Sequence, residues 1–153
     1  MKIDFKKLIL IIIVTFIIGS FFAPFVDMNI YKEIIRPKFS PPSIAFPIVW
    51  TILYILMSIS FYLVLKSSNT DQKSSLKIYL FQLIINSTWT LIFFGFRNYL
   101  LGIIWIILLI VLVITMLVNF YQKNKLSGLL QIPYLIWLIF AGYLNLMIYI
   151  DTS

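Results

Sequence analysis

The chain alternates between long apolar stretches and short polar connections along most of its length. Five stretches contain no Asp, Glu, Lys or Arg: residues 8–26, 44–65, 78–96, 99–121 and 129–150. As α-helices they would be about 28 to 35 Å long, which matches the ~30 Å hydrocarbon core of a bilayer. None shows the polar face that a helix of a soluble protein presents to water. The pattern therefore predicts an all-α membrane protein, a five-transmembrane-helix bundle, in one domain over residues 1–153.

The first stretch follows a basic start, so a cleaved signal peptide is the alternative to a first helix. Its 19 residues exceed the ~7–15 residues of a normal signal-peptide core, and no A-x-A-like cleavage site follows it. We therefore expect residues 8–26 to form helix one.

The Lys and Arg residues divide unevenly between the two sides that five spans would create. Eight fall on the side of the N-terminus: Lys2, Lys6, Lys7, Lys66, Lys73, Lys77, Lys123 and Lys125. The other four fall on the opposite side: Lys32, Arg36, Lys38 and Arg97. By the positive-inside rule, this predicts that the N-terminus lies in the cytoplasm and the C-terminus outside. We expect an integral membrane protein of a bacterial cell membrane.

The composition excludes several kinds of chemistry. Hydrophobic residues make up 62% of the 153 residues and charged residues only 11%, so a water-soluble domain is not expected. The chain has no His and no Cys, which excludes disulfides, thiolate or imidazole metal sites and His-ligated haem. We expect neither a metal nor a resident cofactor. The net charge of +7 is not gathered in a dense basic run, so nucleic acid is not an expected partner.

Large aromatic and polar side chains recur at helical spacing in three of the five stretches, which places them on one face of each helix. They are Trp50, Tyr54, Met57 and Phe61 in the second, Asn86, Trp89, Thr90 and Phe93 in the third, and Trp137, Ala141 and Asn145, with Leu144 beside them, in the fifth. If these faces converge, they form an aromatic cavity with a few amide and hydroxyl groups. The alternative is that they are helix-packing surfaces or interface belts.

Two other features suggest close packing and a covering loop. Gly19 and Ala23 have the small-x-x-x-small spacing that permits close helix approach, either within one chain or at a dimer seam. The connection at residues 27–43 is apolar and rich in proline, which prevents long helices. We expect this connection to lie on the membrane surface or over the mouth of the bundle.

Three blocks of sequence resemble the TspO/MBR family, the tryptophan-rich sensory proteins related to the mitochondrial translocator protein. RPKFSPPSIAFPIVWTILY, from Arg36 to Tyr54, is similar to the family's K-P-x-W-x-P-P and V-W-x-x-L-Y. NSTWTLIFFGFR, from Asn86 to Arg97, resembles N-x-x-W with F-F-G. PYLIWLIFAGYLN, from Pro133 to Asn145, resembles P-Y-x-x-W-x-x-F-A-x-x-L-N.

The resemblance implies a five-helix bundle, commonly a homodimer, whose pocket binds porphyrins, benzodiazepine-type ligands and, in some members, sterols. The ligand-binding residues that it implies are Trp50, Tyr54, Asn86, Trp89, Trp137, Ala141 and Leu144. The lid-like loop that it implies contains Arg36, Pro37, Phe39, Pro41 and Pro42. Two departures matter: Phe39 replaces the family's Trp, and Tyr149 lacks the following Lys or Arg of the sterol pattern.

A porphyrin needs aromatic surfaces for its ring and cations for its propionates. We expect Trp50 and Trp137 to contact the ring, and Lys32, Arg36 or Lys38 to meet the propionates. Without His or Cys the site lacks a strong axial ligand and should prefer a metal-free porphyrin. The resemblance also implies sensory, transport or light-dependent porphyrin-degrading roles, the last requiring Trp50 or Trp137 as the oxidisable group. A passive transporter, or a structural or regulatory subunit without a ligand, is the alternative.

Overall fold

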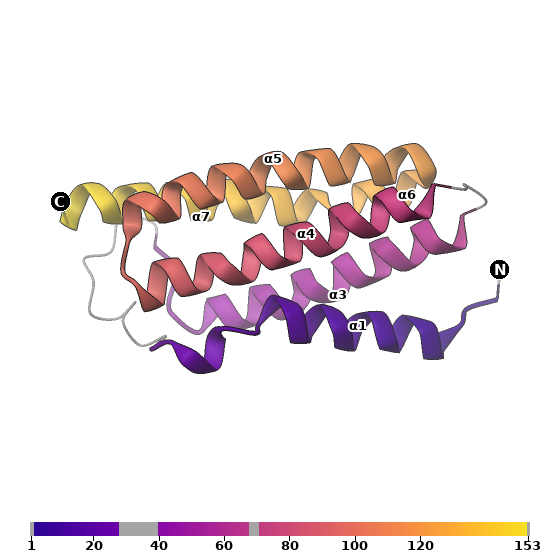
Figure 1. Ribbon diagram of the computed structural model, residues 1–153, viewed down its shortest axis with the longest axis horizontal. Coiled ribbons are helices and arrows are strands. Elements are labelled where there is room, and N and C mark those ends of the chain that lie inside the picture. The colour runs from indigo at the N-terminus through magenta and orange to yellow at the C-terminus, as the bar shows by residue number, and fades with distance from the viewer. Residues whose placement is uncertain (1, 28–39, 68–70, 153) are drawn as a thin grey trace.

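The computed structural model describes residues 2–27, 40–67 and 71–152. Within these residues it is helical and contains no strand. Five helices are long and apolar enough to cross a membrane, which confirms the predicted fold class. They lie side by side along one axis, and the two chain ends lie at opposite ends of the bundle (Figure 1).

Each long helix packs against at least one other long helix. Helix α1 (Phe5–Gly19) packs against α3 (Ala45–Lys66) and α4 (Gln72–Thr90), and α4 packs against α5 (Tyr99–Lys123). Helix α5 in turn packs against α7 (Ile132–Thr152). The short helix α6 (Lys125–Leu129) joins α5 to α7 and rests on α3.

Four helices begin at an Asp or Asn whose side chain accepts a hydrogen bond from a backbone N–H of the first turn. Asp4 caps α1, Asp71 caps α4, Asn98 caps α5 and Asn124 caps α6. Such caps satisfy N–H groups that have no partner inside the helix. They also explain why α1 and α4 begin earlier than residues 8 and 78: the cap residue, rather than the apolar boundary, sets the start.

Proline explains two differences at helix ends. The first α-helix stops at Gly19 instead of residue 26, and the 3-10 helix η1 (Ala23–Phe25) follows it. Pro24 has no N–H to donate to Ser20 and would clash with that carbonyl in an α-helix. Pro133 likewise has no N–H to donate to the carbonyl oxygen of Leu129. The helix therefore breaks here, and the fifth span consists of α6 and α7 instead of one helix that begins at residue 129.

Helix α4 ends in a π-helical turn, η2 (Leu91–Gly95), in which Phe96 N–H donates to Leu91 O at 2.9 Å. Arg97 then adopts a φ of 52°, in the left-handed region, and Asn98 begins α5. This turn brings α4 and α5 together as an antiparallel pair.

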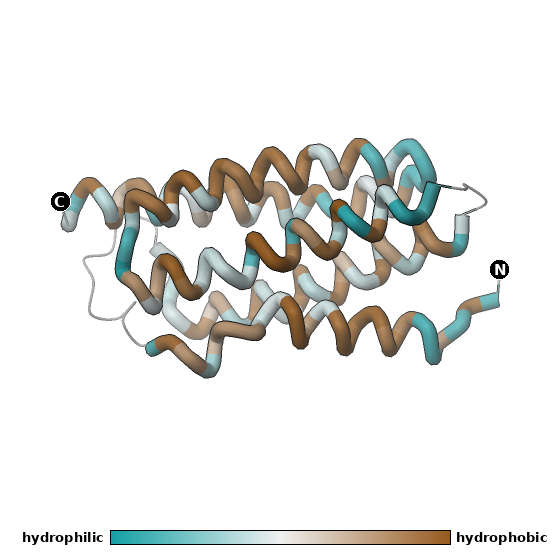
Figure 2. The backbone as a smooth tube through the Cα atoms, viewed as in Figure 1, coloured by the Kyte–Doolittle hydropathy of each residue, from teal (hydrophilic) through white to brown (hydrophobic). Residues whose placement is uncertain are grey.

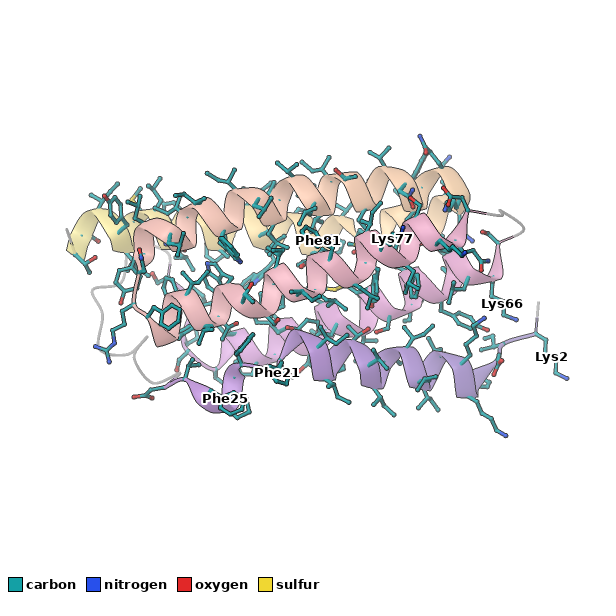
Figure 3. The ribbon with its side chains drawn as sticks, viewed as in Figure 1. Lys2, Phe21, Phe25, Lys66, Lys77 and Phe81 are labelled. Atoms are coloured by element: carbon teal, nitrogen blue, oxygen red, sulfur yellow. The ribbon has the colours of Figure 1, made fainter. Side chains whose placement is uncertain are left out.

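The hydrophilic residues gather at the end of the bundle that carries the N-terminus (Figure 2). Lys2 and Lys66 lie at this end, whereas Phe25 lies toward the other (Figure 3). Lys73 and Lys77 belong to the first two turns of α4 and are exposed. This end of the bundle, where the eight lysines of the N-terminal side lie, is called the lysine-rich end below.

A buried chain of hydrogen bonds connects three helices halfway along the bundle. Tyr134 of α7, 1% exposed, donates to Gln82 Oε1 at 2.7 Å and accepts from Asn86 Nδ2 at 2.7 Å. Gln82 also donates to the carbonyl oxygen of Tyr79, whose hydroxyl bonds to Thr15 of α1 at 2.7 Å. The chain therefore links α7 to α4 and α4 to α1.

We predict that Tyr134→Phe destabilises the bundle by about 1 kcal/mol, because it removes one partner from each of two buried amide groups. Thermal unfolding in detergent measures the effect. Tyr149→Phe on the same helix is the matched control, since Tyr149 is only half-buried. Equal melting temperatures for the two variants would contradict the prediction.

We also predict that Gly128→Ala lowers stability by about 1–3 kcal/mol, as overpacking does. A Cβ at Gly128 would lie 2.7 Å from the Cα of Tyr121, and backbone cannot move aside cheaply. Gly142→Ala is the control, because its new Cβ would meet only the Cγ2 of Ile106, at 3.1 Å. The same melting experiment should show a clear loss for Gly128→Ala alone, and a comparable loss in both variants would show that the close approach is unimportant.

Candidate functional site

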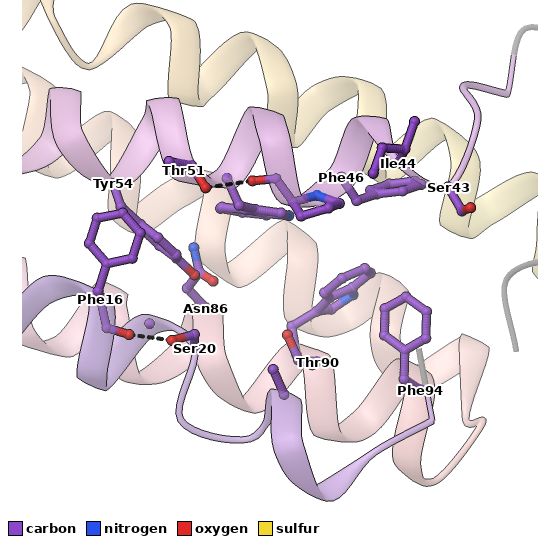
Figure 4. A pocket seen from close by; sticks show the side chains of 15 residues that line it. Phe16, Ser20, Ser43, Ile44, Phe46, Thr51, Tyr54, Asn86, Thr90 and Phe94 are labelled. Atoms are coloured by element: carbon purple, nitrogen blue, oxygen red, sulfur yellow. Dashed lines mark hydrogen bonds between the residues drawn. The ribbon is translucent and has the colours of Figure 1, made fainter. Parts of the chain in front are cut away.

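A cavity of about 590 Å³ lies between α1, α3 and α4, toward the end of the bundle opposite the lysine-rich end. Figure 4 shows its lining from close by. Six aromatic side chains line it: Phe16, Phe46, Trp50, Tyr54, Trp89 and Phe94. We call this space the main cavity.

The aromatic rings that line the main cavity contact one another. The Trp50 and Tyr54 rings lie 5.5 Å apart, and the edge of Phe16 meets Tyr54 at 5.2 Å. Trp89 contacts Phe94 edge-on at 6.1 Å. Such contacts hold each ring in place, so the wall offers preformed apolar faces to a flat ligand.

Gly19 makes room for Tyr54, which is 5% exposed. A Cβ at Gly19 would lie 2.6 Å from Cζ of the Tyr54 ring, so a larger residue at this position would displace the ring. Ala23, the second residue of the small-x-x-x-small pair, lines the main cavity. Within the described residues, the pair therefore serves packing inside the chain and the shape of the cavity.

Trp89 is held in place by Asn145 of α7. The indole N–H of Trp89 donates to Asn145 Oδ1 at 3.1 Å, and Asn145 Nδ2 donates to the carbonyl oxygen of Tyr99 at 2.9 Å. Gly102 of α5 allows this arrangement, because a Cβ there would lie 2.7 Å from Asn145 Oδ1. Asn145 is 1% exposed and positions a cavity ring without lining the main cavity itself.

The polar groups of the main cavity are neutral. Asn86 is fixed by its bond to Tyr134, and the hydroxyls of Ser20 and Thr51 donate to the carbonyl oxygens of Phe16 and Pro47. Their oxygens can still accept a hydrogen bond from a ligand. No charged side chain lines the main cavity among the residues that the structure describes.

Of the residues predicted to bind a ligand, Trp50, Tyr54, Asn86 and Trp89 line the main cavity together. Ala141 and Leu144 line a second void of about 20 Å³ against α7, called the small void below. Trp137 lines neither, and its ring meets the edge of Phe46 at 5.7 Å.

The predicted lid is described only in part. Pro41 and Pro42 lie a few residues before α3, and the carbonyl oxygen of Pro42 accepts from Ala45 N–H at 3.0 Å. Arg36, Pro37 and Phe39 lie outside the described residues, as do Lys32 and Lys38.

Phe16, Phe46 and Phe94 line the main cavity but were not among the residues predicted to bind a ligand. Phe46 stands four residues before Trp50, a spacing that puts both on one helical face and could have identified it. Phe94 is harder to predict, because it is five residues after Trp89. The π-helical turn η2 shifts the register so that Phe94 lines the main cavity, whereas Phe93 stacks on Trp89 and lines only the small void.

Comparison with known proteins agrees with this architecture. The sequence profile of the TspO/MBR family matches residues 8–150. "Tryptophan-rich protein TspO" of Chlorobaculum tepidum is 36% identical over 85% of this chain and 84% of that protein. "Protein CrtK" of Rhodobacter capsulatus is 37% identical over 78% of this chain and 76% of that protein. The human "Translocator protein" is 31% identical over 88% of this chain and 82% of that protein.

The family match covers all five spans and each of the three sequence blocks, and several relatives share about a third of their residues with this chain. The chain is therefore an integral membrane protein that belongs to the TspO/MBR family.

Proposed function

We propose that this protein binds a porphyrin, or another flat hydrophobic molecule, in the main cavity. The observation that carries the proposal is the set of six preformed rings around about 590 Å³ of space. That volume lies within the range of ligand sites, roughly 300–1,000 Å³. A mostly apolar wall with a few neutral polar groups suits a ligand that partitions into the bilayer.

Trp50 and Trp89 are the side chains that we propose to contact the ligand ring, with Asn86 and Tyr54 available as hydrogen-bond donors or acceptors. We propose that the propionates of a porphyrin meet Lys32, Arg36 or Lys38. The absence of His and Cys from the chain favours a metal-free porphyrin over haem, because no strong axial ligand is present.

A binding protein fits better than an open channel. Between the main cavity and the lysine-rich end, Met57, Leu83 and Met116 are fully buried in the packed core. Because these apolar side chains fill the core, passage of a ligand through the described part of the bundle would require the helices to move. Sensing, transport and light-dependent degradation of a porphyrin all begin with binding, and binding is the step that we propose.

The binding proposal predicts that Trp50→Ala and Trp89→Ala each weaken binding of protoporphyrin IX by about tenfold, because each removes a large apolar contact. Titration of the purified protein, followed by porphyrin absorbance, measures the dissociation constants. Absorbance avoids the loss of tryptophan signal in the variants.

Trp105→Ala is the matched control for these variants, because Trp105 packs against the core but lines neither the main cavity nor the small void. Binding by the control should equal that of the unaltered protein. Equal weakening in all three variants, or tighter binding of haemin than of protoporphyrin IX, would count against the proposed site.

We also propose that the lysine-rich end faces the cytoplasm of a bacterial cell, with the main cavity toward the outer face of the membrane. The support is the excess of Lys at that end, together with the positive-inside rule. The homodimer that the resemblance implies stays a prediction of the sequence.

The chain lacks Cys, so a single introduced thiol reports the orientation without further changes. In intact cells we expect a membrane-impermeant maleimide to label Thr152→Cys and to leave Lys73→Cys unlabelled until the membrane is permeabilised. Both positions are exposed. The reverse labelling pattern would invert the proposed topology.

A further inference from the structure

Helix α4 exposes one narrow row of side chains, which we call the α4 stripe. It consists of Lys73, Leu76, Lys77, Phe81 and Ile84, and the residues of α4 between them are buried or half-buried. Spacings of three and four residues put all five on one face of the helix. Lys77 lies nearer the lysine-rich end than Phe81 does (Figure 3). The α4 stripe therefore begins with two cations and continues with apolar side chains.

The two lysines of the α4 stripe can act on a single anion. Side chains four residues apart on a helix have Cβ atoms about 5–6 Å apart, so both ammonium groups can reach one phosphate. Neither lysine forms an ion pair with another described residue. The two carboxylates described at this end, Asp4 and Asp71, cap α1 and α4 by accepting backbone N–H groups. The charge of the α4 stripe is thus left to be balanced from outside the chain.

The position of Lys77 along α4 indicates where such an anion would lie. Helix α4 begins at Gln72 and rises about 1.5 Å per residue, so the Cα of Lys77 is about 8 Å inside the start of the helix. A lysine at this depth lays its apolar stem along the helix and extends its ammonium group toward the headgroup layer. Phe81 lies about 6 Å deeper, at the level of acyl chains. This order, from cations to apolar side chains, is complementary to a phospholipid.

A second copy of the chain is the other molecule that could cover the α4 stripe. A two-fold dimer brings the same face of both subunits together, so the lysines of one copy would meet those of the other. Close approach of membrane helices also requires small side chains, and none of the five residues of the α4 stripe is small. Charge and shape therefore both favour a lipid over a second copy.

We propose that the α4 stripe binds an anionic phospholipid from the leaflet at the lysine-rich end. Lys73 and Lys77 hold the phosphate of the headgroup, and Phe81 and Ile84, about half exposed, pack against an acyl chain. A zwitterionic lipid such as phosphatidylcholine binds less well, because its choline brings a further cation to the two lysines. The main cavity lies toward the opposite end of the bundle, so this site does not depend on the proposed function.

Native mass spectrometry of the purified full chain in detergent tests the site, with palmitoyl-oleoyl phosphatidylglycerol and phosphatidylcholine as probes. We expect the unaltered protein to bind phosphatidylglycerol more tightly than phosphatidylcholine. Lys73→Gln combined with Lys77→Gln should weaken binding of phosphatidylglycerol about thirtyfold and leave binding of phosphatidylcholine unchanged.

Lys6→Gln combined with Lys7→Gln is the matched control for the lysine pair. It removes the same charge from exposed positions at the same end. Neighbouring residues of a helix point about 100° apart, however, so these two lysines do not share one phosphate as Lys73 and Lys77 do. The control should weaken binding of phosphatidylglycerol far less than the Lys73 and Lys77 pair does.

Phe81→Ala tests the contact with the acyl chain. Loss of the ring should weaken binding of phosphatidylglycerol about fivefold, because less apolar surface is covered. Phe25→Ala is the control, since Phe25 is 71% exposed and lies toward the other end of the bundle. Every substituted side chain is exposed, so the variants should melt at the temperature of the unaltered protein.

Four results would overturn the site. Equal weakening by the two lysine pairs would show a general attraction of the lysine-rich end, and equal affinity for the two lipids would show no selection for charge. Displacement of phosphatidylglycerol by excess inorganic phosphate would identify a free anion as the occupant. The chain has no Cys, so complete disulfide formation between copies of Lys77→Cys would show that a second copy covers the α4 stripe.

Discussion

The bilayer gives helices no hydrophobic reason to associate, because lipid tails are as apolar as the side chains that face them. What holds this bundle together must therefore be close packing and hydrogen bonds between helices. Buried hydrogen bonds from Tyr134 to Gln82 and Asn86 connect α7 to α4. The hydrogen bond between Tyr79 and Thr15 connects α4 to α1. The apolar outer surface of the bundle mainly stabilises its insertion in the membrane and not the association of its helices.

The need for close packing and hydrogen bonds between helices also explains why the two ends of the bundle are packed differently. Toward the lysine-rich end, Ser60 of α3 bonds to Ser127 of α6 and accepts from Gln131 Nε2 at 2.8 Å, so small polar residues bring the backbones close. Toward the other end, large rings take the place of small residues: Trp50 meets Tyr134, and Phe46 meets Trp137. Rings hold α3 and α7 together through side chains, and the main cavity lies at this end of the bundle.

Asn86 connects the core with the site. Its amide nitrogen donates to Tyr134, so Asn86 stands at one end of the buried hydrogen-bond chain, and its side chain also lines the main cavity. A ligand in the main cavity would therefore contact the network that joins α4 to α7. The main cavity and the helix packing share this residue, so occupancy of the cavity would act directly on a side chain that joins two helices.

The five membrane spans follow from the sequence, because a charge in hydrocarbon is so unfavourable that the uncharged stretches mark them directly. Helical spacing also placed Trp50 and Tyr54 on one face of α3, and Asn86 and Trp89 on one face of α4, and these four residues line the main cavity. Which faces of different helices meet depends on the tertiary structure. The π-helical turn places Phe94 at the main cavity, and Phe46 lines both that cavity and the small void beside Ala141. Periodicity describes one helix at a time, whereas a cavity is bounded by side chains from several helices whose rotation and separation depend on contacts far apart in the chain.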